Sequence, residues 1–348
     1  MGELKNSVVQ ITLEEWHQFA SGFDNRHVFH HKGWIQTLQE TYHFPLRIFG
    51  VKMGDSENLV TALPFMQVFN IKGKRKWICL PFTDFFPVLG DIEQAAWLVK
   101  NLHQTHQLKG EIEVRFELPQ DKTFHYSIHQ VWHSVNLRID PEMLHQQIAR
   151  NHRKALRQGK HRGVKVEFPT SIQAMEEYFD LQLRTRHAKG LPTQPWKFFM
   201  NLQKYLIDGG ANGCIVLAKN KFTVIGGKVM LYWGKTLTGK YSASNYAFLS
   251  FRPNQMVYWK SILWAIDHGF QVYDLGKTTT DNDGLCRFKR GWTAIEEPLR
   301  YTYLGVDRDV EISEPTESGL VGLMSSLIAR SPLLVSRLIG KLFYRFFT

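Results

Sequence analysis

The sequence predicts an α+β protein with mixed sheets, made of two consecutive domains and a helical tail. With 348 residues, the chain is longer than the roughly 100–200 residues typical of one domain. Hydrophobic residues make up 43% of it and aromatic residues 13%, which is enough apolar material for two cores. One order of elements, α-α-β-β-β-α-β, occurs twice. We therefore expect domains at residues 1–165 and 166–310, followed by a tail at 311–348.

Each predicted domain runs from two helices into three strands, a helix and a last strand. Thr12 and Glu15 have capping-box spacing in the first domain, and Thr170 and Ser171 precede the first helix of the second. Runs rich in β-branched and aromatic residues between polar turns predict the strands. The first domain's segments are LEEWHQFA, WIQTLQETY, LRIFGVK, LVTALPFMQVF, RKWICLPF, AAWLVKNLHQTH and EIEVRFEL; the second domain's are AMEEYFDLQLRTRH, PWKFFMNLQKYLI, GCIVLAK, TVIGGKVMLYW, TGKYSASNYAF, RPNQMVYWKSILWAIDHG and QVYDLG.

A strongly basic segment joins the two halves. RNHRKALRQGKHRGVK has seven Lys or Arg in sixteen residues, and no acidic residue lies between Glu142 and Glu167. We expect a basic helix at residues 143–162 that ends the first domain and carries cations on several faces. Such a helix is either a solvated linker or a surface for phosphate or RNA, and the sequence favours neither.

A three-stranded meander, a helix and a returning parallel strand form the core order of GNAT-type acyltransferases, although other α+β domains alternate similarly. More specific phrases follow one another along the chain: HKGWIQTLQETYHF, RKWICLPFTDFFPVLG, ARNHRKALRQGKHRGVKVEF, LRTRHAKGLP and YSASNYAFLSFRPNQ, then DLGK followed by RFK and a tryptophan. Through these phrases the chain resembles the FemAB-like family, which is related to the peptidoglycan interpeptide-bridge aminoacyltransferases, from about Phe29 to Tyr303.

The resemblance implies a tandem GNAT-like enzyme that joins an acyl or aminoacyl group to an amine. In bridge-forming members the donor is aminoacyl-tRNA, and the acceptor is a cell-envelope precursor with a nucleotide- or lipid-linked pyrophosphate. Those members often insert a tRNA-associated helical hairpin in the second domain, whereas LRTRHAKGLPTQPWKFF here runs directly from helix to helix. The direct connection counts against tRNA as the donor. We expect no bound cofactor and an activated acyl donor, either aminoacyl-tRNA or acyl-CoA, as co-substrate.

Two other functions remain as alternatives. One is an acyl-CoA-dependent N-acyltransferase acting on an amino sugar or a lipid amine. The turns SFRPNQ and PVLGDIE disfavour it, because they lack the glycine-containing phrase with which CoA-using GNATs bind pyrophosphate at a helix N-terminus. The other is a non-catalytic protein that binds nucleic acid or a membrane.

The stretch GLCRFKRGW holds the main catalytic candidate. Amide formation needs a deprotonated amine, a stabilised oxyanion and a proton for the leaving group. Lys289 matches the lysine of the family's FK phrase, and the resemblance implies a cation there beside the reacting carbonyl or the leaving group. Arg287 suits phosphate or carboxylate, and Arg290 is expected to face solvent. A solvated basic turn is the alternative for Lys289 and Arg287.

Two carboxylates are further catalytic candidates. Asp274 is expected at the end of the strand in VYDLGK, and Asp84 follows the third strand of the first domain. A carboxylate at a strand end can orient an acceptor amine or take its proton, and it can equally pair with a cation or cap a turn.

Six residues are candidates for substrate binding. The basic ones lie in family-like phrases and suit phosphate or peptide carboxylate, while the others offer hydroxyl or amide groups, although a tyrosine in a strand often only packs. They are Lys277, Lys32, Arg186, Tyr241, Ser244 and Asn254.

The net charge indicates the kind of partner, and the cysteine content helps to indicate the cellular compartment. A formal net charge of +11 favours anionic partners, namely the envelope precursor and tRNA. Cys79, Cys214 and Cys286 form no CxxC motif or disulfide framework, and the first residues lack a signal-peptide pattern, so we expect a cytoplasmic protein. The histidine pairs in HVFHH, HQTH and HYSIH lack the carboxylate of an HExxH site, so no metal is expected.

The tail is predicted to be a basic amphipathic helix. No acidic residue follows Glu317, and the helix is expected to break or restart near Pro332. Leu, Ile, Phe and Val lie opposite the cations, which is typical of an interfacial helix on an anionic membrane, here within residues 319–348. Packing on its own core or on a second subunit is the alternative, and the oligomeric state is not predicted. The cations are Arg330, Arg337, Lys341 and Arg345.

Overall fold

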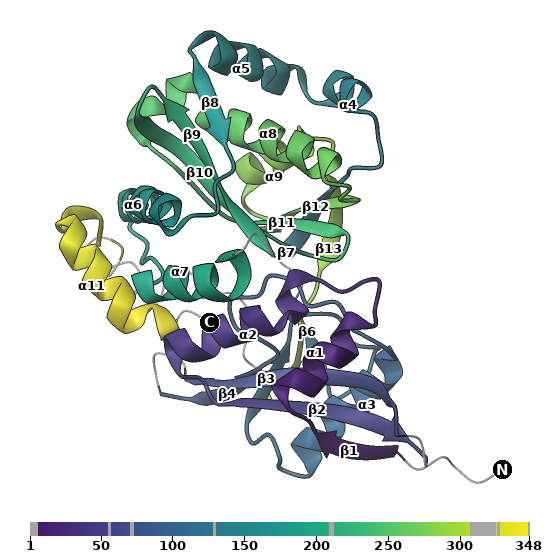
Figure 1. Cartoon of the computed structure of the whole chain (residues 1–348). Coiled ribbons are helices and arrows are strands. Elements are labelled where there is room, and N and C mark those ends of the chain that lie inside the picture. The colour runs from purple at the N-terminus through teal and green to yellow at the C-terminus, as the bar shows by residue number, and fades with distance from the viewer. Residues whose placement is uncertain are drawn as a thin grey trace. The chain divides into compact units, whose positions relative to one another are not determined.

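The computed structural model divides the chain into two compact units, each with its own seven-stranded mixed sheet (Figure 1). The predicted α+β class is therefore confirmed. The first unit comprises Met1–Gln130, Pro298–Glu314 and Arg345–Thr348, and the second comprises Val131–Glu297 and Pro315–Tyr344. The structure describes residues 6–54, 57–69, 73–127, 130–208, 212–306, 325 and 328–346.

The first unit follows the predicted order of elements. Three antiparallel strands form a meander, and a fourth strand returns parallel to the last of them. The capping box is present, since the Thr12 hydroxyl accepts from the Glu15 amide and the Glu15 carboxylate accepts from the Thr12 amide. In chain order the elements are β1 (Asn6–Gln10), α1 (Leu13–Ser21), η1 (Val28–His30), α2 (Lys32–Tyr42), β2 (Leu46–Met53), β3 (Leu59–Phe69), β4 (Arg75–Ile78), α3 (Ile92–Gln104), β5 (Glu111–Val114), β6 (His125–Tyr126) and β14 (Thr302–Leu304), and the sheet order is β1-β2-β3-β4-β5-β14-β6.

The second unit repeats the meander and the returning parallel strand. Its elements are β7 (Gln130–Asn136), α4 (Pro141–Gln147), α5 (Arg150–His161), β8 (Val164–Glu167), α6 (Ile172–Ala188), α7 (Trp196–Leu202), the π-helical η2 (Gln203–Ile207), β9 (Gly213–Asn220), β10 (Thr223–Trp233), β11 (Thr236–Ser244), η4 (Tyr246–Phe251), α8 (Pro253–Asp267), β12 (Val272–Thr279), α9 (Asp283–Arg290), β13 (Ile295–Leu299) and α11 (Leu333–Phe343). The short η5 (Tyr344–Phe346) begins at the last residue of this unit, and its other two residues belong to the first. The sheet order is β13-β7-β12-β11-β10-β9-β8.

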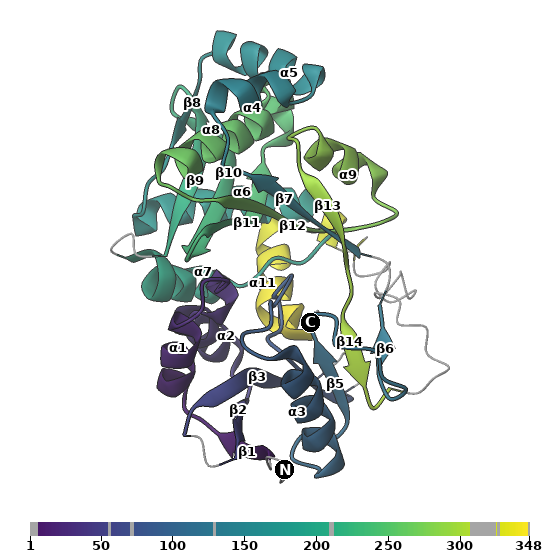
Figure 2. The same ribbon diagram turned by 90° about the vertical axis from the view of Figure 1, so that its right-hand side faces the viewer.

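Helices cover both faces of the second sheet, and two adjacent glycines show how closely they approach. A Cβ at Gly226 would lie 2.7 Å from the Pro253 Cβ in α8, and a Cβ at Gly227 would lie 3.0 Å from the Tyr178 ring in α6. Because neighbouring residues of a strand point to opposite faces, α8 and α6 lie on opposite sides of β10 (Figure 2). Helix α5 packs outside α8.

The division between the units differs from the expected boundary at residue 165. Strand β7 pairs into the second sheet, so the chain enters the second unit near Val131. The expected end of the second domain at residue 310 differs as well, because residues 302–304 return to pair with β5 and β6 of the first sheet.

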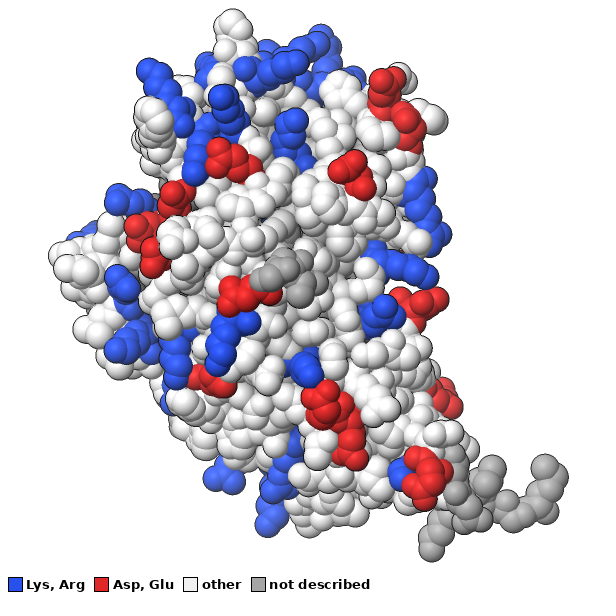
Figure 3. Space-filling view, in the orientation of Figure 1, with Lys and Arg blue, Asp and Glu red and all other residues white. Residues whose placement is uncertain are grey.

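The basic helix expected at residues 143–162 belongs to the second unit, where the chain forms two helices instead of one. Ile148 and Ala149 adopt extended ψ values of 150° and 143°, which separate α4 from α5. Figure 3 shows Lys and Arg side chains gathered over α5. No helix within the part of the chain that the structure describes has the length and apolar character needed to cross a bilayer.

Candidate functional site

Most of the stretch GLCRFKRGW lies in a helix, α9, and not in the basic turn that was the alternative for Lys289 and Arg287. The Asn282 side chain caps it by accepting from the Leu285 amide at 3.1 Å. Helical spacing then sends the three cations in different directions. Lys289 points inward and is only 3% exposed, whereas Arg287 and Arg290 are exposed.

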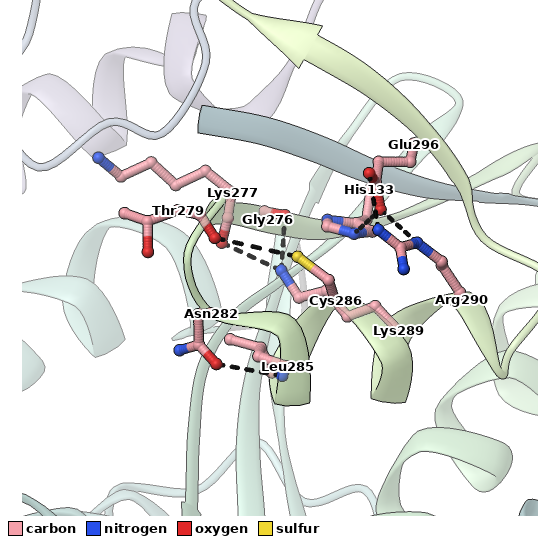
Figure 4. A network of polar contacts seen from close by, with 10 residues as sticks. All are labelled: His133, Gly276, Lys277, Thr279, Asn282, Leu285, Cys286, Lys289, Arg290 and Glu296. Carbon is pink, nitrogen blue, oxygen red and sulfur yellow. Dashed lines mark hydrogen bonds and ion pairs between the residues drawn. The ribbon is translucent and has the colours of Figure 1, made fainter. Parts of the chain in front are cut away.

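The Lys289 ammonium is held by backbone carbonyl groups of β12. Its Nζ donates to the Gly276 oxygen at 2.8 Å and to the Lys277 oxygen at 3.0 Å (Figure 4). A buried cation is stable only if dipoles or charges replace its hydration. The carboxyl-terminal half of β12 supplies such dipoles, so the strand fixes where this positive charge lies.

Asp274 contacts the same segment of the β12 backbone as Lys289. Its Oδ1 accepts from the Gly276 amide at 2.7 Å and from the Trp132 indole at 2.7 Å, and its side chain is 1% exposed. The strand continues to Thr279, so the expectation that Asp274 ends it is wrong. Asp274 and Lys289 therefore meet at Gly276, one on its N–H and one on its C=O.

Lys228 of β10 is a further buried cation, and the sequence reading missed it. The side chain is fully buried, with Nζ 3.0 Å from the Tyr273 hydroxyl oxygen and 3.3 Å from the centroid of the Tyr258 ring. Burial, reinforced by Lys289 and opposed by Asp274, lowers the pKa of Lys228 well below its usual value. The signal that could have revealed it is a lone lysine in the apolar strand TVIGGKVMLYW.

A bulge in the sheet makes room for this lysine. The β10–β11 register shifts between Val229 and Met230, which face Tyr241 and Gly239, so Lys240 is an extra residue on β11. A Cβ at Gly239 would lie 3.1 Å from the Lys228 Nζ and 3.0 Å from the Tyr273 hydroxyl. The glycine therefore permits the close approach of the two polar groups.

Arg290 is exposed, as expected, and it also forms an ion pair. Its guanidinium donates to both Glu296 oxygens, at 2.7 and 3.0 Å, and lowers the pKa of that carboxyl. The His133 Nε2 lies 3.1 Å from the same carboxylate, and burial lowers the pKa of His133 (Figure 4). The network thereby joins α9 to strands β7 and β13.

The Cys286 sulfur lies close to His133 and Glu296, so three atoms of kinds that can bind a metal ion come together. Its sulfur, a ring nitrogen of His133 and a Glu296 oxygen lie within 4.8 Å of one another. Burial raises the pKa of Cys286, which favours the protonated thiol. The three residues are far apart in sequence, so motif spacing gave no sign of them, and the absence of a metal remains a prediction.

The other candidates of the second unit lie in four places. Ser244 and Asn254 come together, with 3.5 Å between the Asn254 Nδ2 and the Ser244 Oγ. Arg186 donates from Nε to the Pro192 carbonyl, and Tyr241 packs with ring centroids 5.8 Å from Phe198. Lys277 shares β12 with Asp274, but its side chain points away from the Lys289 network in Figure 4.

Lys32 and Asp84 belong to the first unit. Lys32 begins α2 and forms an ion pair with Glu14 at 2.9 Å. Asp84 is half-buried in the loop after β4, and its carbonyl accepts from the Tyr301 hydroxyl at 2.5 Å.

Two helix N-termini that follow the meanders are poorly suited to a pyrophosphate. In α3 the Asp91 carboxylate caps the helix by accepting from the Glu93 and Gln94 amides at 2.8 and 3.2 Å. In α8 the first residue is Pro253, which has no N–H to donate. A negative cap and a missing donor both weaken anion binding at a helix start.

Residues 146–290 match the family model of the acetyltransferase (GNAT) domain. This part of the chain is therefore similar to a GNAT domain. The matched region ends at Arg290, the last residue of α9, and so includes Lys228, Asp274 and Lys289. No curated protein matches the chain.

Solved structures share the fold of this protein at low sequence identity. FemX is 16% identical with a TM-score of 0.67, covering 86% of this chain and 97% of its own. The C-terminal domain of a putative lysylphosphatidylglycerol synthetase from Agrobacterium fabrum is 12% identical with a TM-score of 0.55, covering 91% and 96%. A tandem GNAT protein from the clavulanic acid biosynthesis pathway is 12% identical with a TM-score of 0.52, covering 88% and 100%. The predicted tandem GNAT fold is thereby confirmed.

Proposed function

We propose that this protein forms an amide by transferring an acyl or aminoacyl group to an amine of a cell-envelope precursor. The observation that carries the proposal is the buried Lys289 ammonium, which α9 holds against two carbonyl oxygens of β12 within the matched GNAT domain. A fixed cation in a water-poor site stabilises negative charge that develops during the reaction far better than one in water.

The amine attacks the donor carbonyl directly in the proposed reaction. The new C–N bond forms as the carbonyl π pair moves to oxygen, and collapse of this oxyanion expels the carrier's oxygen or sulfur. The nitrogen gives up a proton and the leaving group gains one, which balances the step. Lys289 stabilises the oxyanion or the leaving group. Asp274 acts as a positioning residue, because its bond to the Gly276 amide orients the carbonyl that holds Lys289.

An aminoacyl ester is the donor that fits this chain better than acyl-CoA. The Asp91 cap of α3 and the Pro253 start of α8 both disfavour a pyrophosphate at those helices. The exposed Arg287 suits a phosphate of the donor's carrier or of the acceptor. Aminoacyl-tRNA is therefore the leading donor, and acyl-CoA is the alternative.

The acceptor is proposed to carry a nucleotide- or lipid-linked pyrophosphate. FemX and the lysylphosphatidylglycerol synthetase domain share the fold, and a net charge of +11 favours a polyanionic substrate. Such precursors place the reaction in the cytoplasm near the inner face of the cell membrane. Lys32 and Asp84, in the first unit, remain candidates for contacts with this acceptor.

A donor screen tests the proposal. The pure protein is given labelled aminoacyl-tRNA or acyl-CoA, with muropeptide and amino-sugar acceptors, and amide product is measured for the wild type and for Lys289→Ala. We expect transfer from aminoacyl-tRNA that falls at least about 100-fold in the variant. Arg287→Ala is the matched control on the exposed side of the same helix, and it should mainly raise the KM for the phosphate-bearing substrate. Absence of transfer from either donor, or equal transfer by Lys289→Ala, would refute the proposal.

A further inference from the structure

Helix α11 is fixed to the second unit by its small residues. A Cβ at Gly340 would lie 2.3 Å from the Thr193 carbonyl oxygen, so only glycine allows the helix to approach that loop so closely. Ser336, one turn earlier, is 1% exposed, and its Oγ lies 3.5 Å from the Ile328 oxygen. The Arg337 guanidinium lies over the Phe179 ring of α6 at 5.5 Å. These contacts set the rotation of the helix about its axis.

That rotation turns the large apolar side chains of α11 outward. Leu334 is 77% exposed, Leu338 54% and Leu342 53%, and this i, i+4, i+8 spacing aligns them in one row. Val335 and Phe343, at 42% and 41%, widen the row. A contiguous apolar surface of this kind on a folded unit marks an interaction site, because leaving it in water is costly.

A row of cations runs beside the leucine row. Arg337 and Lys341 are exposed, and each directly precedes a leucine of the row. No acidic residue occurs after Glu317 in the sequence. In Figure 3 the surface around α11 accordingly carries Lys and Arg side chains beside uncharged residues. Long basic side chains can reach headgroup phosphates while neighbouring leucines enter the acyl boundary.

We propose that the outward face of α11 docks the protein on an anionic lipid bilayer. The helix would lie in the plane of the interface, with Leu334, Leu338 and Leu342 in the acyl boundary and Lys341 at the headgroups, while Arg337 stays over the Phe179 ring. Charge complementarity selects lipid over a second copy of the chain, because a self-complementary contact would bring two basic rows together. Where the acceptor of the proposed reaction is lipid-linked, this face would bring the enzyme to its substrate.

Vesicle co-sedimentation of the full chain tests the docking face. Binding is compared between vesicles of phosphatidylcholine alone and vesicles that also contain phosphatidylglycerol. We expect the wild type to prefer the anionic vesicles, Leu338→Glu to lose at least about tenfold in affinity, and Lys341→Gln to lose about fivefold. Phe222→Glu is the matched control, because Phe222 is a fully exposed aromatic residue in the β9–β10 turn and should bind like the wild type.

Two results would overturn the inference. One is a wild type that does not bind the anionic vesicles or that keeps its affinity with Leu338→Glu. The other is a dimer in light scattering that Leu338→Glu converts to monomer, since the face would then be a subunit interface. The assay uses neither donor nor acceptor, so vesicle binding without turnover would refute the proposed function and leave this inference standing. Turnover on a soluble acceptor without vesicle binding would do the reverse.

Discussion

The two units build the same meander and returning strand, yet they bury charge in different ways. In the first, Glu113 of β5 lies between two cations, with its carboxylate oxygens 3.0 Å from the Lys76 Nζ and 2.6 Å from the Arg115 Nε. In the second, Lys289 donates to backbone carbonyls, and Lys228 meets a hydroxyl and an aromatic ring. The Glu113 carboxylate neutralises the charge of its two cations, whereas the Gly276 and Lys277 carbonyl dipoles stabilise the Lys289 cation without cancelling its charge. A shared fold therefore does not imply a shared role, and the chemistry is expected in the second unit.

Removing the carboxylate of the first unit should have the largest effect on stability. Glu113→Gln leaves Lys76 and Arg115 without their counter-charge in a site where Glu113 is 4% exposed. We expect the free energy of unfolding to fall by about 3–5 kcal/mol in urea titrations. Glu14→Gln breaks the exposed pair with Lys32 and should lower the free energy of unfolding far less. Similar losses in the two variants would show that the buried ion pairs of Glu113 stabilise the fold no more than an exposed pair does.

Acid should destabilise the first unit through His30. Its buried ring accepts from the His27 amide at 2.9 Å and lies 2.8 Å from the Pro87 oxygen, and burial lowers its pKa to about 3. Between pH 6.5 and 3 the unfolded chain binds a proton that the folded chain does not, so stability falls as the pH falls. The loss at pH 5 is about 2 kcal/mol.

The slope of unfolding free energy against pH checks this prediction. His30→Gln should reduce the slope between pH 6.5 and 5 by up to about 1.4 kcal/mol per pH unit. An unchanged slope would mean that His30 does not control the acid sensitivity.

Lys228→Met should change stability least. Burial lowers the pKa of Lys228 well below its usual value, so the folded protein gains little from the charge, and methionine fills a similar volume. We expect a free energy of unfolding within about 1 kcal/mol of the wild type at neutral pH. Wild-type stability should rise with pH from the lowered pKa towards that of an ordinary lysine, and the variant should lose this rise. A larger loss of unfolding free energy would show that the charge of Lys228 stabilises the folded protein.

The sequence predicted the regular elements well and the long-range partners poorly. Runs of β-branched and aromatic residues between polar turns located β3 and β10 with the bounds that the structure shows, because such a run is a local property of the chain. The pairing of β7 with the second sheet and the return of β14 to the first could not be predicted, since both depend on contacts between distant residues.

The same limit applies to the site. The FK phrase marked Lys289, but its partners Gly276 and Lys277 come from the preceding strand, and only the fold shows that α9 turns the side chain towards them. Arg290 was assigned to solvent because its partner Glu296 lies beyond the phrase, on β13. In the tail, spacing predicted an amphipathic helix, but only the contact of Gly340 with Thr193 shows that the leucines face outward.

The rate of the chemical step in Lys289→Met tests the central claim most directly. The measurement is single-turnover acyl transfer at saturating donor and acceptor, with the unfolding midpoint of each protein as the control for folding. We predict a rate at least about 100-fold below the wild type, with donor affinity little changed, because the ammonium acts on charge that appears only during the reaction. A folded Lys289→Met protein that transfers at the wild-type rate would contradict the account.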